Sequence, residues 1–225
     1  MNRSNRIDLA LLCLTGFLRS FATGLMGVIF GVYLFRLGRG SAEIGILTAA
    51  GLAGATIATA WITWCGDRFG RRKALIVLAL LWVAGGAGLA FVSSFTGLLL
   101  VVFAGMVNAM GTDRSASYVI EQAALPNLVS DRDRTWTFSW YHLVLDAGGA
   151  LGALAAALPI ILYRWRAVPI PTGYAAVFLG YSALGLASAI AYSFISNRIE
   201  TAPTGQLTPN LSSTSKKHVF RLARL

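Results

Sequence analysis

The sequence predicts an all-α, polytopic membrane protein. Of its 225 residues, 56% are hydrophobic and 12% are charged, and the mean hydropathy is +0.66. A soluble domain carries about 25% charged residues, so this composition excludes a soluble enzyme and a disordered regulator. The apolar residues gather in six runs, each near the roughly 20 residues that a helix needs to cross a bilayer. The runs are continuous rather than alternating, which favours helices over the strands of a barrel.

The six predicted spans occupy residues 1–195, which we expect to form one transmembrane domain. The first run is too long for a cleaved signal peptide, and Arg19 interrupts it. The fourth run ends near Pro126 and is the most polar in its second half. Residues 196–225 are polar and basic, which predicts a cytoplasmic tail or a linker. The expected spans are residues 8–35, 42–65, 74–92, 97–125, 136–162 and 170–195.

The distribution of Lys and Arg predicts that both termini are cytoplasmic. With the N-terminus inside, thirteen basic residues fall in cytoplasmic segments, against four in the outer loops. The four are Arg36, Arg39, Arg164 and Arg166. The same bias, with attraction to anionic lipid, accounts for the net charge of +10 without a nucleic-acid partner. Short loops and the lack of a cleaved leader indicate a prokaryotic inner membrane.

The loop after the second run is the most specific short pattern. It reads Gly-Asp-Arg-Phe-Gly-Arg-Arg-Lys over residues 66–73. Gly70 can take a positive φ and turn the chain sharply, and Asp67 can accept hydrogen bonds from the cations or from a helix N-terminus. An ordinary positive-inside loop explains the arginines but not this close spacing.

This loop resembles the signature of the major facilitator superfamily, Gly-x-x-x-Asp-Arg-x-Gly-Arg-Arg/Lys between helices two and three. The first glycine is replaced by Thr63. The resemblance implies a conformational latch at the cytoplasmic face, formed by the matching residues Asp67, Arg68, Gly70, Arg71 and Arg72. It also implies that the six spans form two inverted three-helix repeats, half of a twelve-helix fold. Helices one and four would then line the central cavity, and helices three and six would face lipid.

Ionisable residues inside the spans are the candidate functional residues, because such groups are costly in lipid and usually face a cavity or a partner. Span three and span six contain none. We expect Arg19 of span one to pair with Asp113 of span four, and His142 to pair with Asp146 one helical turn later. The candidates for the substrate or proton pathway are Arg19, Asp113, Arg114, Glu121 and Asp146.

Arg114 and Glu121 also admit a structural interpretation. Residues seven apart share one face of a continuous helix, so the two could form a stabilising pair near the cytoplasmic end of span four. Glu121 would then lie near the membrane interface.

The resemblance implies secondary active transport of a small solute by alternating access, coupled to a proton or another gradient. The chain would be the N-terminal half and would need a second six-helix half, covalent or from a second copy. The glycine run at residues 148–153 loosely resembles a motif of proton-coupled exporters, which would indicate efflux, but it lacks that motif's Gly-Pro. The alternative is a non-transporting scaffold, a receptor or a decayed half-transporter.

We expect no enzymatic activity, cofactor or metal site. Cys13 and Cys65 lie in apolar runs and lack a metal-ligand spacing. A nucleotide-binding loop is absent from the sequence. His142 and Asp146 could take part in acid–base chemistry, but no nucleophile accompanies them.

Overall fold

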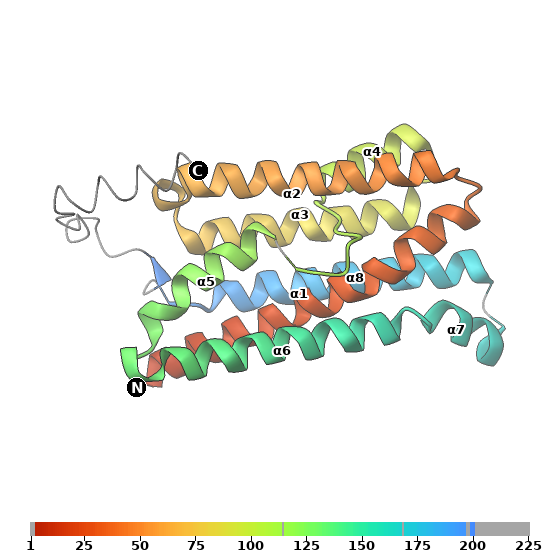
Figure 1. Ribbon diagram of the computed structural model, residues 1–225. Helices are drawn as coiled ribbons and strands as arrows, with labels where there is room; N and C mark the ends of the chain where they lie inside the picture. Colours follow the sequence, from red (N-terminus) through yellow and green to blue (C-terminus); the bar gives the residue numbers. More distant parts are fainter. Residues whose placement is uncertain (1–2, 114, 168, 197–198, 201–225) are drawn as a thin grey trace, which may run out of the picture.

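The computed structural model describes residues 3–113, 115–167, 169–196 and 199–200, without the side chains of 3–4, 65–68 and 166. These residues form one bundle of long helices lying side by side (Figure 1). The elements are α1 (Arg3–Arg36), α2 (Ser41–Phe69), α3 (Arg71–Phe91), α4 (Phe95–Ala104), α5 (Ala116–Leu128), a 3-10 turn (Asp131–Asp133), α6 (Arg134–Ala155), α7 (Leu158–Arg166) and α8 (Ile170–Ser193).

Five segments of the described chain are long and apolar enough to cross a membrane. α6 and α7 form one of them, because the chain turns only briefly between the two helices and Pro159 lies in the first turn of α7. The start of α1, the α2–α3 turn and the end of α8 lie at one end of the bundle (Figure 1). The segments are Asn5–Arg36, Ser41–Trp64, Arg71–Phe91, Asp131–Trp165 and Ile170–Ser193.

The prediction of one continuous helix over residues 97–125 is wrong. α4 ends at Ala104, and an irregular segment precedes α5, which begins at Ala116. Glycines and short polar residues disfavour a helix here, and Gly111 has a φ of 73°. The hydroxyl of Ser115 then caps α5 by accepting a hydrogen bond from the Tyr118 N–H (3.3 Å).

This break also changes the expected relation of Arg114 to Glu121. Arg114 lies outside the described residues, and the helix that would place it on the face of Glu121 begins only at Ala116. Glu121 is completely buried inside the bundle.

Close backbone contacts fix the positions of the helices. α1 packs mainly on α6, α3 on α8, and α2 on α4. The small-residue face of α6 makes the first of these contacts possible, since a Cβ added at Gly152 would lie 1.9 Å from the Phe21 carbonyl oxygen of α1. In the irregular segment, Gly105 also lies close to Gly85 of α3, since an added Cβ would be 2.4 Å from the Gly85 Cα. The fourth span therefore unwinds against backbones that leave no room for side chains.

Candidate functional site

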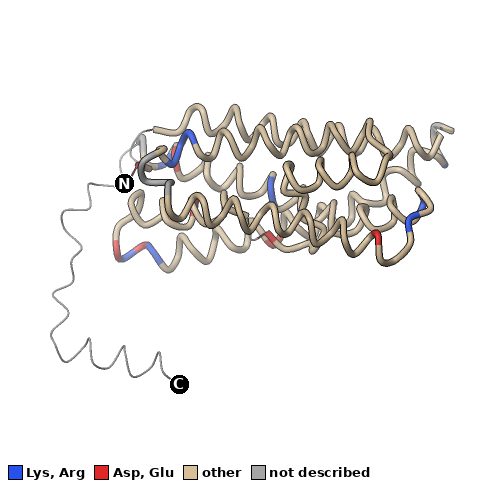
Figure 2. The backbone as a smooth tube through the Cα atoms, turned by 90° about the horizontal axis from the view of Figure 1, so that it is seen from above, with Lys and Arg blue, Asp and Glu red and all other residues tan. Residues whose placement is uncertain are grey.

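A buried ionic cluster lies near the middle of the bundle, away from the charges at its ends (Figure 2). The Arg19 Nε of α1 donates to Asp113 Oδ2 at 2.6 Å. Its two terminal nitrogens form a bidentate pair with Glu121 of α5, at 2.8 and 2.7 Å. The structure therefore joins Arg19 to both acids, whereas the sequence led us to expect Asp113 alone. Among the described residues, two carboxylates face one guanidinium, so this cluster carries one uncompensated negative charge when both acids are ionised.

Glu121 is the most strongly coordinated member of this cluster. Besides Arg19, its carboxylate accepts hydrogen bonds from the hydroxyls of Tyr141 and Tyr192, both at 2.5 Å, and of Thr15 at 3.0 Å. Asp113 has fewer partners, since its second oxygen accepts a single bond from the Ser115 backbone N–H at 3.2 Å. Glu121 thus holds Arg19 in place, and Asp113 is the acid with free acceptor capacity.

The sequence analysis missed the three hydroxyl donors around Glu121. A lone tyrosine or threonine in an apolar span looks like ordinary core packing, and only the fold brings Thr15 of α1, Tyr141 of α6 and Tyr192 of α8 to one carboxylate.

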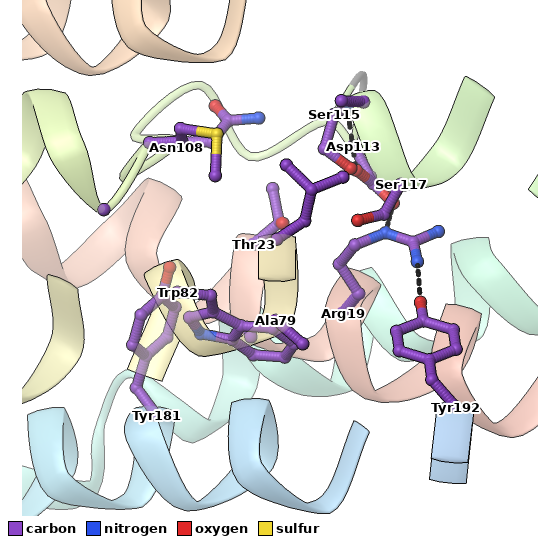
Figure 3. A pocket seen from close by; sticks show the side chains of 15 residues that line it. Arg19, Thr23, Ala79, Trp82, Asn108, Asp113, Ser115, Ser117, Tyr181 and Tyr192 are labelled. Carbon is purple, nitrogen blue, oxygen red and sulfur yellow. Dashed lines mark hydrogen bonds and ion pairs between the residues drawn. The ribbon is translucent and has the colours of Figure 1, made fainter. Parts of the chain in front are cut away.

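A cavity opens beside the cluster (Figure 3). Arg19 and Asp113 form one wall, Trp82 of α3 and Tyr181 of α8 form another, and the irregular segment contributes Met106 and Asn108. Counted with its mouth, the cavity has a volume of about 570 Å³. The expectation that the third and sixth spans face lipid is therefore incomplete, because α3 and α8 each turn one aromatic face into this cavity.

Asp146 and His142 lie elsewhere, in a second cavity that also touches Asp113. The predicted pair of His142 with Asp146 is wrong: no hydrogen bond or ion pair joins these two side chains in the structure. His142 Nε2 instead lies 3.2 Å from the amide nitrogen of Gln122, on α5. Asp146 makes no ion pair with any other described residue.

The α2–α3 turn carries the predicted latch residues. The positive φ predicted for Gly70 is confirmed, at 91°. The side chains of Asp67 and Arg68 lie outside the described part of the chain. Arg71 donates from its guanidinium to the carbonyls of Ala123 and Ile199, both at 3.2 Å.

Glu200 is an unpredicted partner of this turn. Its carboxylate accepts the backbone N–H groups of Arg71 and Arg72, at 2.8 and 3.3 Å, and so caps the N-terminus of α3. Glu200 is the single acid in the basic stretch 196–225, which is the signal that could have marked it. The Arg72 side chain also donates to the Ser193 carbonyl at the end of α8.

A bundle of membrane-spanning helices, with an ionic cluster buried beside a polar cavity, is typical of a polytopic transport protein. A sequence profile of the Major Facilitator Superfamily matches residues 12–223. The chain belongs to this superfamily. It is accordingly a multi-pass integral membrane protein of a small-solute transporter family and not an enzyme.

Two similar proteins are informative. The chain is 27% identical to the uncharacterized membrane protein YJR124C of Saccharomyces cerevisiae over 157 residues, which cover 70% of this chain and 35% of that protein. It is 34% identical to a D-xylose transporter of Levilactobacillus brevis over 120 residues, 48% of this chain and 26% of the transporter. The chain thus matches about a third or less of the length of these relatives.

Proposed function

We propose that this chain forms the N-terminal half of a secondary active transporter, which moves a small polar solute by alternating access. The observation that carries the proposal is the buried cluster of Arg19, Asp113 and Glu121 at the wall of a cavity. Ionised side chains inside a membrane are costly, and they are commonly retained for binding or coupling. The resemblance of part of the chain to a D-xylose transporter supports a sugar as solute.

Proton coupling follows from the charge balance of the cluster. With both acids ionised, one negative charge is uncompensated, and binding one proton makes the cluster neutral. Asp113 is the acceptor, because Glu121 is saturated with hydrogen-bond donors and Asp113 is not. Protonation replaces the ionic bond between Asp113 and Arg19 Nε with a weaker hydrogen bond to a neutral acid, which loosens the hold on the irregular segment before α5. A proton gradient would thereby bias the two states.

Two inverted three-helix repeats are supported by the helix pairs. Spans one to three are α1, α2 and α3, and spans four to six are α4–α5, α6–α7 and α8. Inverted repeats relate span one to four, two to five and three to six. This relation converts the α1–α6 pair into the α4–α2 pair and leaves the α3–α8 pair unchanged. These three are the main packed pairs of the bundle. This correspondence of helix pairs supports the proposed inverted repeats.

A second six-helix half is supported by the outer faces of α2 and α6. α2 is the least buried of the long apolar segments, followed by the α6–α7 segment. Trp64 of α2 is 86% exposed, and Trp136 and Leu154 of α6 are 67% and 73% exposed. These faces suit a second half, which the same reading frame or a second copy would supply. The DNA sequence after the codon for Leu225 distinguishes the two sources.

The Arg71–Glu200 contacts support a latch at the end of the bundle that carries both described termini. They tie the α2–α3 turn to the segment after α8. The basic residues of this end favour a cytoplasmic location in a prokaryotic inner membrane.

The test is solute flux into proteoliposomes that contain the protein expressed from its full natural reading frame. We expect uptake of a neutral sugar that rises with an imposed proton gradient, inward or outward according to the direction of coupling. A protein that moves none of a broad panel of sugars, amino acids and organic ions under any gradient would instead be a non-transporting membrane protein, and the proposal would be abandoned.

A further inference from the structure

Four polar groups without a protein partner lie around the cavity beside Arg19. The indole Nε1 of Trp82 is buried and has no hydrogen-bond partner in the described structure. The hydroxyls of Thr23, Ser117 and Tyr181 also form no hydrogen bond to another described residue; each residue is 92–94% buried, but these hydroxyl oxygens, unlike Trp82 Nε1, are not completely buried. Buried polar groups are nearly always paired with protein, water or a ligand. Four unpaired groups from α1, α3, α5 and α8 around one cavity therefore indicate that a polar guest completes it.

The chemistry of the four groups defines the guest. A hydroxyl both donates and accepts, and an indole N–H donates, so a complementary guest must offer donors and acceptors at several neighbouring positions. Apart from the charged wall and the polar residues Asn108 and Ser115, the remaining lining is largely apolar and aromatic. It includes Leu78, Ala79 and the rings of Trp82 and Tyr181, which pack edge to face at 5.4 Å. Few polar groups set in an apolar lining are typical of sites for small neutral molecules.

The charged wall of the cavity disfavours an anionic guest. Every guanidinium nitrogen of Arg19 already donates to an acid or a tyrosine hydroxyl. An anion would have to displace an acid from this guanidinium, and separating such a buried pair is strongly unfavourable. A neutral hydroxylated molecule uses the four unpaired groups and leaves the pair intact.

The size of the cavity limits how much of the guest enters. Its inner part has room for a few water-sized groups. The irregular segment then connects it to a wider groove along α2, since Met106, Asn108 and Ser115 line both spaces. One edge of a guest can therefore enter the inner cavity while its body lies in the groove.

We infer that this cavity is a binding site, inside this six-helix half, for the hydroxyl-bearing edge of a neutral sugar or polyol. Thr23, Trp82, Ser117 and Tyr181 are the groups that bind it. The inference rests on the proposed transport function for its biological role, but binding can be measured independently of flux.

Removing one hydroxyl at a time tests the site. Tyr181→Phe and Ser117→Ala should each raise the half-saturation concentration for a neutral sugar about three- to tenfold, the loss expected for one hydrogen bond. Tyr174→Phe is the matched control, because Tyr174 is also buried on α8 but lies outside the cavity lining; it should change the value less than twofold. The sugar-free proteins should share one thermal midpoint, since the removed hydroxyls bond to no described residue.

The assay uses the full natural protein with D-xylose, D-glucose and sorbitol, and with the charged analogues D-xylonate and D-glucosamine. Equilibrium binding and proteoliposome flux are measured on the same preparation. Binding of a neutral member that Tyr181→Phe and Ser117→Ala weaken supports the site, even without flux, in which case the transport proposal alone fails. Equal binding by all four proteins would show that the sugar does not contact these hydroxyls, and selective flux of a charged analogue would show a solute of another class. Either result overturns the inference without contradicting transport itself.

Discussion

Replacing Glu121 with glutamine removes one negative charge from the buried cluster and keeps the shape of the side chain. In the native structure the carboxylate accepts five hydrogen bonds, two from Arg19 and one each from Thr15, Tyr141 and Tyr192. A glutamine amide places an N–H₂ group where one carboxylate oxygen was. That N–H₂ group would face the Arg19 Nη2 and the Tyr141 hydroxyl. The guanidinium nitrogen can only donate, so it would face another donor and lose its acceptor.

The expected loss is large because the site is dry. Glu121 is 0% exposed and the Arg19 side chain is 8% exposed, so water cannot replace the lost partner. Arg19 keeps its pair with Asp113, but leaving a buried donor of a charged group without an acceptor still costs about 3 kcal/mol or more. For a domain of this size, each kcal/mol moves the thermal midpoint by about 2–4 °C. Glu121→Gln should therefore lower the midpoint by at least about 6 °C.

The detergent-solubilised protein is heated to a series of temperatures, and size-exclusion chromatography then measures the fraction that remains folded. The temperature at which half is lost gives the midpoint. Glu43→Gln is the matched control, because Glu43 forms an ion pair with Arg39 at 3.3 Å on the surface. An exposed i,i+4 pair contributes about 0.3–0.5 kcal/mol, so the control should move the midpoint by less than about 2 °C. Equal midpoints for the two variants would refute the argument that Glu121 anchors Arg19.

Two further predictions concern packing and the cap of α3. Gly152→Ala should lower the thermal midpoint by several degrees or prevent folding, because its Cβ would lie 1.9 Å from the Phe21 carbonyl oxygen. The control Gly180→Ala has open space around its Cβ and should be neutral or stabilising by up to about 1 kcal/mol. Equal effects of the two variants in a melting assay would contradict the packing described. Glu200→Gln should lower stability by about 1 kcal/mol, or about 2–4 °C, at 0.1 M salt and by less at 1 M salt, because it weakens a charge at a helix N-terminus; a shift that does not depend on salt would argue against this role.

Helix content and the central ion pair could be predicted from the sequence because each depends on a local or strongly constrained property. Long apolar runs specify helices in a membrane, since no other backbone arrangement within a run satisfies its own hydrogen bonds. An arginine and an acid in different apolar spans are expected to meet, as Arg19 and Asp113 do, because neither is stable alone in lipid.

The break in the fourth span could not be predicted in the same way. Average hydropathy over residues 97–125 says nothing about helix continuity, and the unwound segment depends on tertiary contacts such as that of Gly105 with Gly85 of α3. The pairing of His142 with Asp146 failed because one helical turn brings two residues to the same face without bringing their polar atoms together. Gln122, from another helix, lies closer to His142.

The aromatic residues of the site were missed for a related reason. Trp82 and Tyr181 lie in spans without charged residues, so the sequence suggested lipid-facing helices. Their position on one wall of the cavity follows from the packing of α3 on α8, which no local pattern specifies.

The central claim is that Asp113 couples solute movement to a proton gradient through its bond to Arg19. The most direct measurement compares the wild-type protein and Asp113→Asn in proteoliposomes, with gradient-driven sugar flux as the readout and the amount of folded protein matched. The account predicts that Asp113→Asn folds, because the amide oxygen can still accept the bond from Arg19 Nε, and that it no longer responds to the proton gradient. Gradient-driven flux that continues unaltered in Asp113→Asn would show that Asp113 is not the coupling residue.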